Sequence, residues 1–244
     1  MNLTKEQWLE AMDLPAGDVP DLLILEGTWW EDQAYEARLA HLDDVRMLAF
    51  PGMAWGRHRG RPVVYCCAYG APRAVEPVHA LGAVGTRHVV QIGSCGGLQE
   101  GVATGDVVVP ERAVIGEGAS QYYGGSGMAV ASPELLDQAA RRLRERGLTV
   151  HRGLHLTTSS LFMQPPDAIA RWRETGYLGV DMETSAVFSA ARRMDMRAVS
   201  LVFVWDELLR GRTWLDPFPE DEAQRQRDAN AAIFDVALDL LEVP

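Results

Sequence analysis

The sequence is poor in positive charge. Its 244 residues include 23 lysines and arginines against 34 aspartates and glutamates, a formal net charge of -11 at pH 7. A surface that binds nucleic acid or anionic lipid needs a basic footprint. We therefore expect no nucleic acid and no membrane surface as a partner.

Long hydrophobic runs are also missing. No segment reaches the roughly 18 consecutive apolar residues that a membrane-spanning helix needs. The first residues show no basic region followed by an apolar run, so no export signal is expected. The cytoplasm is the expected location.

Cysteine is scarce. The three cysteines, Cys66, Cys67 and Cys95, are an odd number, and none has the spacing of a metal-ligand pair. Reduced, buried thiols are expected. The sequence indicates no metal site and no organic cofactor.

What the sequence does contain is a series of apolar runs that alternate with helical patterns. Hydrophobic residues make up 47% of the chain, enough for a sizeable core. The runs are continuous, which predicts an α/β sheet buried on both faces. No repeat or low-complexity linker interrupts them, so we expect residues 1–244 to form a single domain. The expected strands are residues 21–25, 62–68, 88–93, 106–110 and 198–204.

Three helices are expected between and after these strands. Ser132 as N-cap and Gly147 just past the end delimit one, and the others should cover about residues 183–194 and 228–241. Residues 210–224 contain two prolines and an acidic run. They are expected to form a surface loop over a site.

The stretch VVQIGSCGG (89–97) runs from a buried strand into glycines and a serine. Glycines let the backbone turn sharply and approach a ligand, and successive N–H groups can hold an anion or a hydroxyl. Ligands of α/β sheets bind at such carboxyl ends of strands. A tight turn without a ligand explains the same residues. The stretch is neither a Walker loop nor a dinucleotide fingerprint.

Two acidic positions each have a structural and a functional explanation. Glu183, with Asp181 and Met182, lies where a loop enters a helix, so it either favours the helix dipole or accepts hydrogen bonds from two sugar hydroxyls beside the Met182 thioether. Asp206 follows Trp205 at the end of an apolar strand. It is either an N-cap or a buried acid whose raised pKa lets it protonate a leaving group.

Taken in order, these segments resemble the nucleoside phosphorylase superfamily of purine nucleoside phosphorylases, uridine phosphorylases and methylthioadenosine/adenosylhomocysteine nucleosidases. Residues 92–109 match its glycine-rich strand end and following Gly-Asp-hydrophobic run, residues 181–186 its Glu-Met-Glu motif, and residues 205–206 its strand-ending Ser-Asp. The resemblance spans most of the chain. It implies a three-layer α/β/α fold with a central mixed, twisted sheet, cleavage of a nucleoside, and a homo-oligomer, either a dimer or a hexamer built as a trimer of dimers.

The resemblance also implies roles for single residues. Glu183, Met182 and Ser94 would bind the ribose, and Asp206 would protonate, or hydrogen-bond to, the purine ring nitrogen, so Glu183 and Asp206 are the expected catalytic residues. Uridine phosphorylases usually lack that acid and read the base with a Gln and an Arg. No matching Arg follows Phe162, so a purine-type base is favoured. The positions expected to line the base are Cys95, Gly96, Phe162, Val180, Asp181 and Trp205.

The nucleophile site departs from the family pattern. Gln91 replaces the arginine of the Arg-hydrophobic-Gly-Ser/Thr motif that leads to Ser94, and Glu31 replaces the arginine of the Gly-Asp-Pro-x-Arg motif that begins at Gly27. A charge-assisted hydrogen bond contributes about 1.5 to 3 kcal/mol. Losing two would weaken phosphate capture by several powers of ten.

Three hypotheses remain open. The protein is a phosphorylase, a glycosyltransferase with phosphate as co-substrate, in which Arg46, Arg57 or Arg73 supplies the missing charge. Alternatively, it is a hydrolytic nucleosidase, with Glu31 or Asp32 as the general base for water. A third possibility is a nucleoside-binding protein without turnover, against which the retained catalytic acids count.

Tryptophan is plentiful. Of the seven tryptophans, Trp29, Trp30 and Trp205 lie near the inferred site. They suggest a pocket remodelled for an unusual base or 5′ substituent, although core packing explains isolated tryptophans equally well. Because Trp205 stands where the family commonly has serine, we expect a narrower base subsite.

Overall fold

The apolar runs form one mixed sheet. The computed structural model describes residues 3–50, 52–211 and 216–242, and within these ranges ten strands follow the order β10-β6-β8-β9-β5-β1-β4-β3-β2, with β7 beside β6. The strands are β1 (Leu22–Gly27), β2 (Asp43–Met47), β3 (Met53–His58), β4 (Arg61–Cys67), β5 (His88–Gly97), β6 (Val107–Gly116), β7 (Met128–Val130), β8 (Val150–Thr158), β9 (Gly179–Asp181) and β10 (Arg197–Glu207).

The centre of the sheet is parallel. Strands β4, β1, β5 and β10 lie side by side in parallel, and β10 also pairs antiparallel with β6. Because β6, β8, β9 and β5 pair in succession as well, the sheet closes on itself beside the carboxyl end of β5. The five expected strands are confirmed as β1, β4, β5, β6 and β10. Strands such as β2 and β8 have too many polar residues to be found as continuous apolar runs.

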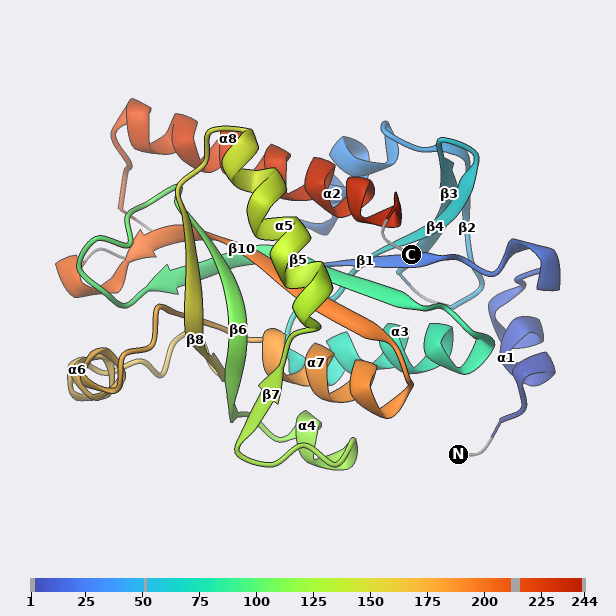
Figure 1. Cartoon of the computed structure of the whole chain (residues 1–244), viewed down its shortest axis with the longest axis horizontal. Helices are drawn as coiled ribbons and strands as arrows, with labels where there is room; N and C mark the ends of the chain where they lie inside the picture. Colours follow the sequence, from blue (N-terminus) through green and yellow to red (C-terminus); the bar gives the residue numbers. More distant parts are fainter. Residues whose placement is uncertain (1–2, 51, 212–215, 243–244) are drawn as a thin grey trace.

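Helices cover both faces of the sheet, as Figure 1 shows. Helices α3 and α7 lie against one face, and α5 and α8 lie against the other. The expected three-layer α/β/α architecture is therefore confirmed. The helices are α1 (Lys5–Met12), α2 (Glu31–Leu39), α3 (Ala71–Val84), α4 (Ala119–Tyr122), α5 (Pro133–Glu145), α6 (Pro166–Thr175), α7 (Thr184–Arg193) and α8 (Glu220–Asp239), with short 3-10 turns η1 (Ala16–Asp18), η2 (Leu208–Arg210) and η3 (Leu240–Glu242).

The expected helices are present, with two corrections. Helix α8 begins at Glu220, earlier than expected, because the acidic residues after Pro219 suit the positive end of a helix. Residues 220–224 are therefore helix and not loop, while residues 212–215 of the expected loop lie outside the described residues. Ser132 precedes α5 as expected, but its hydroxyl accepts the backbone N–H of Ala198 at 2.9 Å instead of capping the helix.

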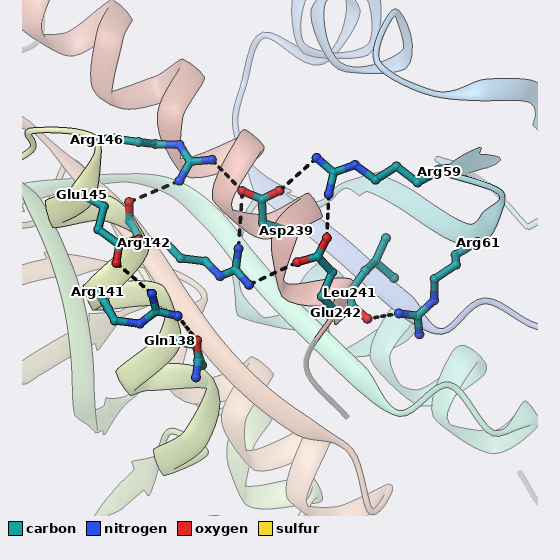
Figure 2. A network of polar contacts seen from close by, with 10 residues as sticks. All are labelled: Arg59, Arg61, Gln138, Arg141, Arg142, Glu145, Arg146, Asp239, Leu241 and Glu242. Atoms are coloured by element: carbon teal, nitrogen blue, oxygen red, sulfur yellow. Dashed lines mark hydrogen bonds and ion pairs between the residues drawn. The ribbon is translucent and has the colours of Figure 1, made fainter.

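An ion-pair network fixes the carboxyl end of α8. Figure 2 shows Asp239 between Arg146, which directly follows α5, Arg142 of α5 and Arg59 of the β3–β4 turn, with N–O distances of 2.5, 3.8 and 3.6 Å. Glu242 pairs with Arg59 at 2.6 Å and with Arg142 at 3.3 Å. Linked ion pairs of this kind hold geometry better than isolated surface pairs. The opposite end of α8 is thereby positioned over the carboxyl ends of the central strands.

Candidate active site

A cavity of about 590 Å³ lies at the carboxyl ends of β1, β5 and β10, beside the first turn of α7. This is the edge at which parallel α/β sheets bind ligands. The structure brings most of the predicted site residues to it. Those that line the cavity are Gly27, Ser94, Cys95, Gly96, Val180, Asp181, Met182, Glu183, Trp205 and Asp206.

Strand pairing explains how three distant segments meet there. Val180 of β9 lies opposite Gly96 of β5, and Asp206 of β10 lies opposite Gly96 on the other side. The register between β10 and β5 shifts between Val204 and Asp206, so Trp205 is an extra residue at a bulge. Bulges re-aim side chains next to sites. Here the bulge brings both Trp205 and Asp206 to the cavity.

Glu183 is a buried carboxyl group held by backbone. Its Oε1 accepts the N–H of Gly70 at 2.7 Å. A methyl group on Gly27 would lie 2.8 Å from the Glu183 carboxyl carbon, so only glycine fits beneath it. Burial, reinforced by the charge of Asp181, raises the pKa of Glu183 to about 8. Near pH 7 this carboxyl group is therefore largely protonated.

Asp181 borders the cavity but is engaged by protein donors. Its oxygens accept from the Thr157 hydroxyl at 2.8 Å, from the backbone N–H of Thr184 at 2.9 Å and from the Thr184 hydroxyl at 2.5 Å, and His155 Nε2 lies 3.4 Å away. Burial alone would raise the pKa of Asp181, but His155 and the two threonines lower it below its ordinary value. Asp181 thus holds the first turn of α7 in place, and its carboxylate has little capacity left for the predicted contact with a base.

Asp206 has the character of an acid. Its carboxyl group makes no hydrogen bond with another described residue, and burial raises its pKa to about 6. Cys95, beside it in the cavity, has a thiol whose pKa burial raises well above its ordinary value. A protonated Cys95 offers a small apolar surface and not a nucleophile. All three cysteines are free and buried, which confirms the expectation for them.

The residues predicted for the nucleophile are not brought together, apart from Gly27 and Ser94. Gln91 is fully buried on the α7 side of β5, where its Oε1 accepts from Ser200 and lies 2.9 Å from the hydroxyl oxygen of Thr184. Gln91 is not part of the lining, which on β5 begins at Gly93. Glu31 and Asp32 are exposed in the first turn of α2, as acids at a helix start commonly are.

Arg46, Arg57 and Phe162 also lie outside the cavity. Both arginines pair with Asp18 at 3.3 Å and lie over the Trp55 ring. The side chain of Phe162 is 71% exposed, and its ring centroid lies 5.9 Å from that of Trp29. Arg73, on α3, pairs with Glu76 at 2.6 Å and does not line the cavity. The expectation that these groups complete the site is not met within one chain.

A buried ion pair that sequence reasoning missed forms part of the lining. Arg38 donates to both oxygens of Glu26, at 3.0 and 3.2 Å, and to Asn230 Oδ1 at 2.6 Å. The Tyr65 hydroxyl donates to Glu26 at 2.8 Å. The local sign of this pair in the sequence is a glutamate within the apolar run LLILEG. Asn230 is 192 positions from Arg38 in the chain, so no local pattern connects these two residues.

Aromatic rings border the cavity mouth. Trp30 and Trp205 stack with centroids 5.8 Å apart, and Trp29 contacts Trp30 at 6.4 Å and Tyr69 at 5.1 Å. Burial and the charge of Glu183 raise the pKa of Tyr69 to about 12. Trp29 and Trp30 remain 40% and 48% exposed. We call these four residues the aromatic wall; it runs from the Glu183 side of the cavity to the Asp206 side.

Among residues 3–50, 52–211 and 216–242, no helix is long and apolar enough to cross a membrane. Within the same ranges, no group of histidine, cysteine and acidic side chains is arranged to hold a metal ion.

The chain is similar to known phosphorylases in sequence and in fold. A family model of the phosphorylase superfamily matches residues 51–242. A purine nucleoside phosphorylase of DeoD type 2 from Vibrio cholerae is 32% identical over 167 residues, 64% of this chain and 68% of that protein. A guanosine phosphorylase from Halorubrum lacusprofundi is 26% identical over 201 residues, 80% and 82% of the two chains. The crystal structure of a uridine phosphorylase from Vibrio fischeri superposes with a TM-score of 0.81 over 93% of both chains, and at 24% identity this likeness concerns the fold.

Proposed function

The chain belongs to the phosphorylase superfamily, and from that premise we propose that it cleaves the N-glycosidic bond of a purine-type nucleoside by transferring the pentosyl group to phosphate. It is an enzyme of the nucleoside phosphorylase class. The relatives named purine nucleoside phosphorylase and guanosine phosphorylase support a purine-type base. The preference for purines and the use of phosphate are parts of the proposal.

One observation carries this function: Asp206 and Glu183 meet across a single cavity. Cleavage of an N-glycosidic bond passes through a sugar with oxocarbenium character and a base that leaves with negative charge. With its pKa raised to about 6, Asp206 can hold a proton for the leaving purine nitrogen. Glu183, fixed by the Gly70 N–H, is held in position to bind the ribose hydroxyls, with Met182 beside it in the lining.

The phosphate would lie over Gly27 and Ser94. Glycine lets the backbone come close to the anion, and the Ser94 hydroxyl makes no hydrogen bond with a described residue, so it is available as a donor. Phosphate is thus a co-substrate, and no further cofactor is proposed.

Hydrolysis is the second candidate, and the charge of the cavity favours it. Of the two arginines in the described lining, Arg38 is neutralised by a buried pair with Glu26 at 3.0 Å, and Arg227 forms an exposed pair with Glu220 at 2.5 Å. An unpaired cation is what a phosphate dianion normally requires. Water, which carries no charge, needs no such group. The carboxyl groups that line the same cavity are Glu26, Asp181, Glu183 and Asp206.

Release of free base from a panel of purine and pyrimidine nucleosides, measured with and without phosphate, tests the proposal. An Asp206→Ala variant serves as the blank. Release that rises with phosphate and yields a sugar 1-phosphate supports phosphorolysis, whereas free sugar formed at a phosphate-independent rate supports hydrolysis. Tight nucleoside binding without release under either condition would mean a binding protein.

A further inference from the structure

His155 is a buried histidine that the proposed chemistry does not use. It lies on β8, is fully buried, and neither of its ring nitrogens makes a hydrogen bond with a described residue. Its Nε2 lies 3.4 Å from Oδ1 of Asp181. Burying a polar ring without hydrogen bonds costs free energy, which the attraction to the Asp181 carboxylate offsets. Burial would raise the pKa of Asp181, and the charge of His155 is the main influence that lowers it instead.

His155 lies directly behind the cavity wall. A methyl group on Gly179 would lie 3.2 Å from His155 Cε1 and 3.0 Å from Cys95 Sγ, so the imidazole packs on β9 beside a side chain that lines the cavity. His155 itself is not among the described residues of the lining. Any influence of His155 on a bound nucleoside therefore passes through a neighbouring residue.

Asp181 connects His155 to the start of α7. Thr184 is the first residue of that helix, and both its backbone N–H and its hydroxyl donate to Asp181 Oδ2, at 2.9 and 2.5 Å. The next N–H, that of Ser185, donates to the Thr157 hydroxyl at 2.9 Å, and this hydroxyl donates to Asp181 Oδ1 at 2.8 Å. The first N–H groups of a helix have no partner within it. In α7, Asp181 and Thr157 satisfy two of them.

This arrangement leaves the N-cap residue of α7 free. Glu183 occupies the N-cap position, where a polar side chain normally accepts an N–H of the first turn, but its side chain makes no such hydrogen bond. Its carboxyl group accepts the Gly70 N–H instead and lines the cavity. Because Asp181 caps the helix in its place, Glu183 can bind a ligand without loosening α7.

We propose that His155 is a positioning residue for the sugar: as the counterion of Asp181, it keeps this carboxylate in place as the cap of α7 and so holds Glu183 toward the ribose hydroxyls. The inference rests on the proposed function and adds to it a residue that acts without touching the substrate. Removing His155 would leave a buried charge at Asp181 without its counterion, which is strongly unfavourable. Asp181 then takes up a proton or moves, the first turn of α7 loosens, and Glu183 loses its fixed position.

Inosine and 2′,3′-dideoxyinosine test the proposal, because only inosine has the 2′ and 3′ hydroxyls that Glu183 would bind. In His155→Leu, the ratio of kcat/KM for inosine to that for the dideoxy compound should fall by about tenfold or more. His155→Gln, which keeps a polar side chain but no charge, is the second variant and should show the same fall. A variant that is merely less stable loses active enzyme for both substrates alike and keeps the ratio. An unchanged ratio would overturn the proposal.

His151, also on β8, provides the matched control. Its Nε2 lies 2.8 Å from Asp106 Oδ2, and neither residue is among the described residues that line the cavity. His151→Leu thus removes a second histidine–aspartate pair of the same strand and should leave the ratio unchanged. An equal fall in the His151 and His155 variants would mean a general effect on the strand and would contradict the assignment.

A double-mutant cycle decides whether His155 acts through Asp181. Asp181→Asn removes the charge that His155 faces and should lower the same ratio. Adding His155→Leu to it should then lower the ratio little further, because the two residues are coupled. Losses that add in full would show that His155 acts independently of Asp181 and would refute the positioning role.

Binding measurements separate this inference from the proposed function. Calorimetric titration with the two compounds needs no turnover. If neither is cleaved but inosine binds more tightly, and His155→Leu removes that difference, the proposed function fails while the positioning role stands. If inosine is cleaved and its advantage over the dideoxy compound survives in His155→Leu, the function stands and the positioning role fails. A wild-type protein that distinguishes the two compounds in neither assay would overturn the positioning role as well.

Discussion

The buried carboxyl group of Glu183 gives a sharp prediction for stability. Its pKa is about 8 in the folded protein against an ordinary value of 4.5. A carboxyl group with a raised pKa favours folding while it is protonated. That contribution is complete below about pH 4.5 and is lost as the pH rises to about 8. Glu183→Gln cannot titrate, and its amide oxygen can still accept the Gly70 N–H.

The magnitude follows from the interval between the two pKa values. At about 1.4 kcal/mol for each pH unit, the free energy of unfolding of the wild type should fall relative to that of Glu183→Gln by on the order of 4 kcal/mol between about pH 4.5 and about pH 8. Burial at 4% exposure means that solvent does little to reduce this figure. The lowered pKa of Asp181 keeps that neighbour ionised throughout, so it adds little to the difference.

Urea denaturation of both proteins across this pH range measures the effect. Taking the difference between them cancels the other titrating groups. Glu174→Gln, at an exposed position on α6, is the control and should follow the wild type at every pH. A difference between wild type and Glu183→Gln that stays constant with pH would refute the reasoning.

Three further predictions concern catalysis. Asp206→Asn should lower kcat for purine nucleosides by roughly 10² to 10⁴ but much less for a nucleoside with an activated leaving group, and equal losses on both would show that Asp206 does not act as an acid. Because Asp206 must be protonated, kcat/KM should fall as the pH rises above about 6, and a pH profile with no alkaline limb in that region would contradict the assignment. Gly27→Ala places a methyl group 2.8 Å from the Glu183 carboxyl group and should lower kcat/KM by about 10², as misplaced groups in active sites do. Gly17→Ala, where nothing lies within 4 Å, should leave the kinetics unchanged, and similar kinetics for both glycine variants would mean that Glu183 does not need its position.

Much of the site could be predicted because it follows the ends of apolar strands. The glycine-rich end of β5, the approach to α7 and the end of β10 are local features of the sequence. In a parallel sheet, the carboxyl ends of neighbouring strands meet at one edge. Glu183, Asp206 and Ser94 therefore come together as the order of the segments implies.

The residues expected around the nucleophile were less predictable, because the direction of their side chains decides whether they line the cavity. Gln91 has the expected place in the sequence, but the packing of α7 against β5 buries it beside Thr184 and Ser200. Glu31 has the spacing of a catalytic acid, yet the start of α2 at that residue turns it to solvent. The spacing of residues along the chain determines neither the burial of Gln91 nor the exposure of Glu31.

The sequence by itself determined strands β1, β4, β5, β6 and β10, the α/β class and the candidate acids Glu183 and Asp206, because these depend on local patterns of apolar and polar residues. Only the tertiary structure decided how far the cavity extends. Glu26, Arg38 and Asn230 lie on β1, α2 and α8, and their hydrogen bonds join positions 12 and 192 residues apart. The cavity reaches α2 and α8 because the packing of both helices over the sheet brings residues of each into its lining, a relation that no local pattern encodes.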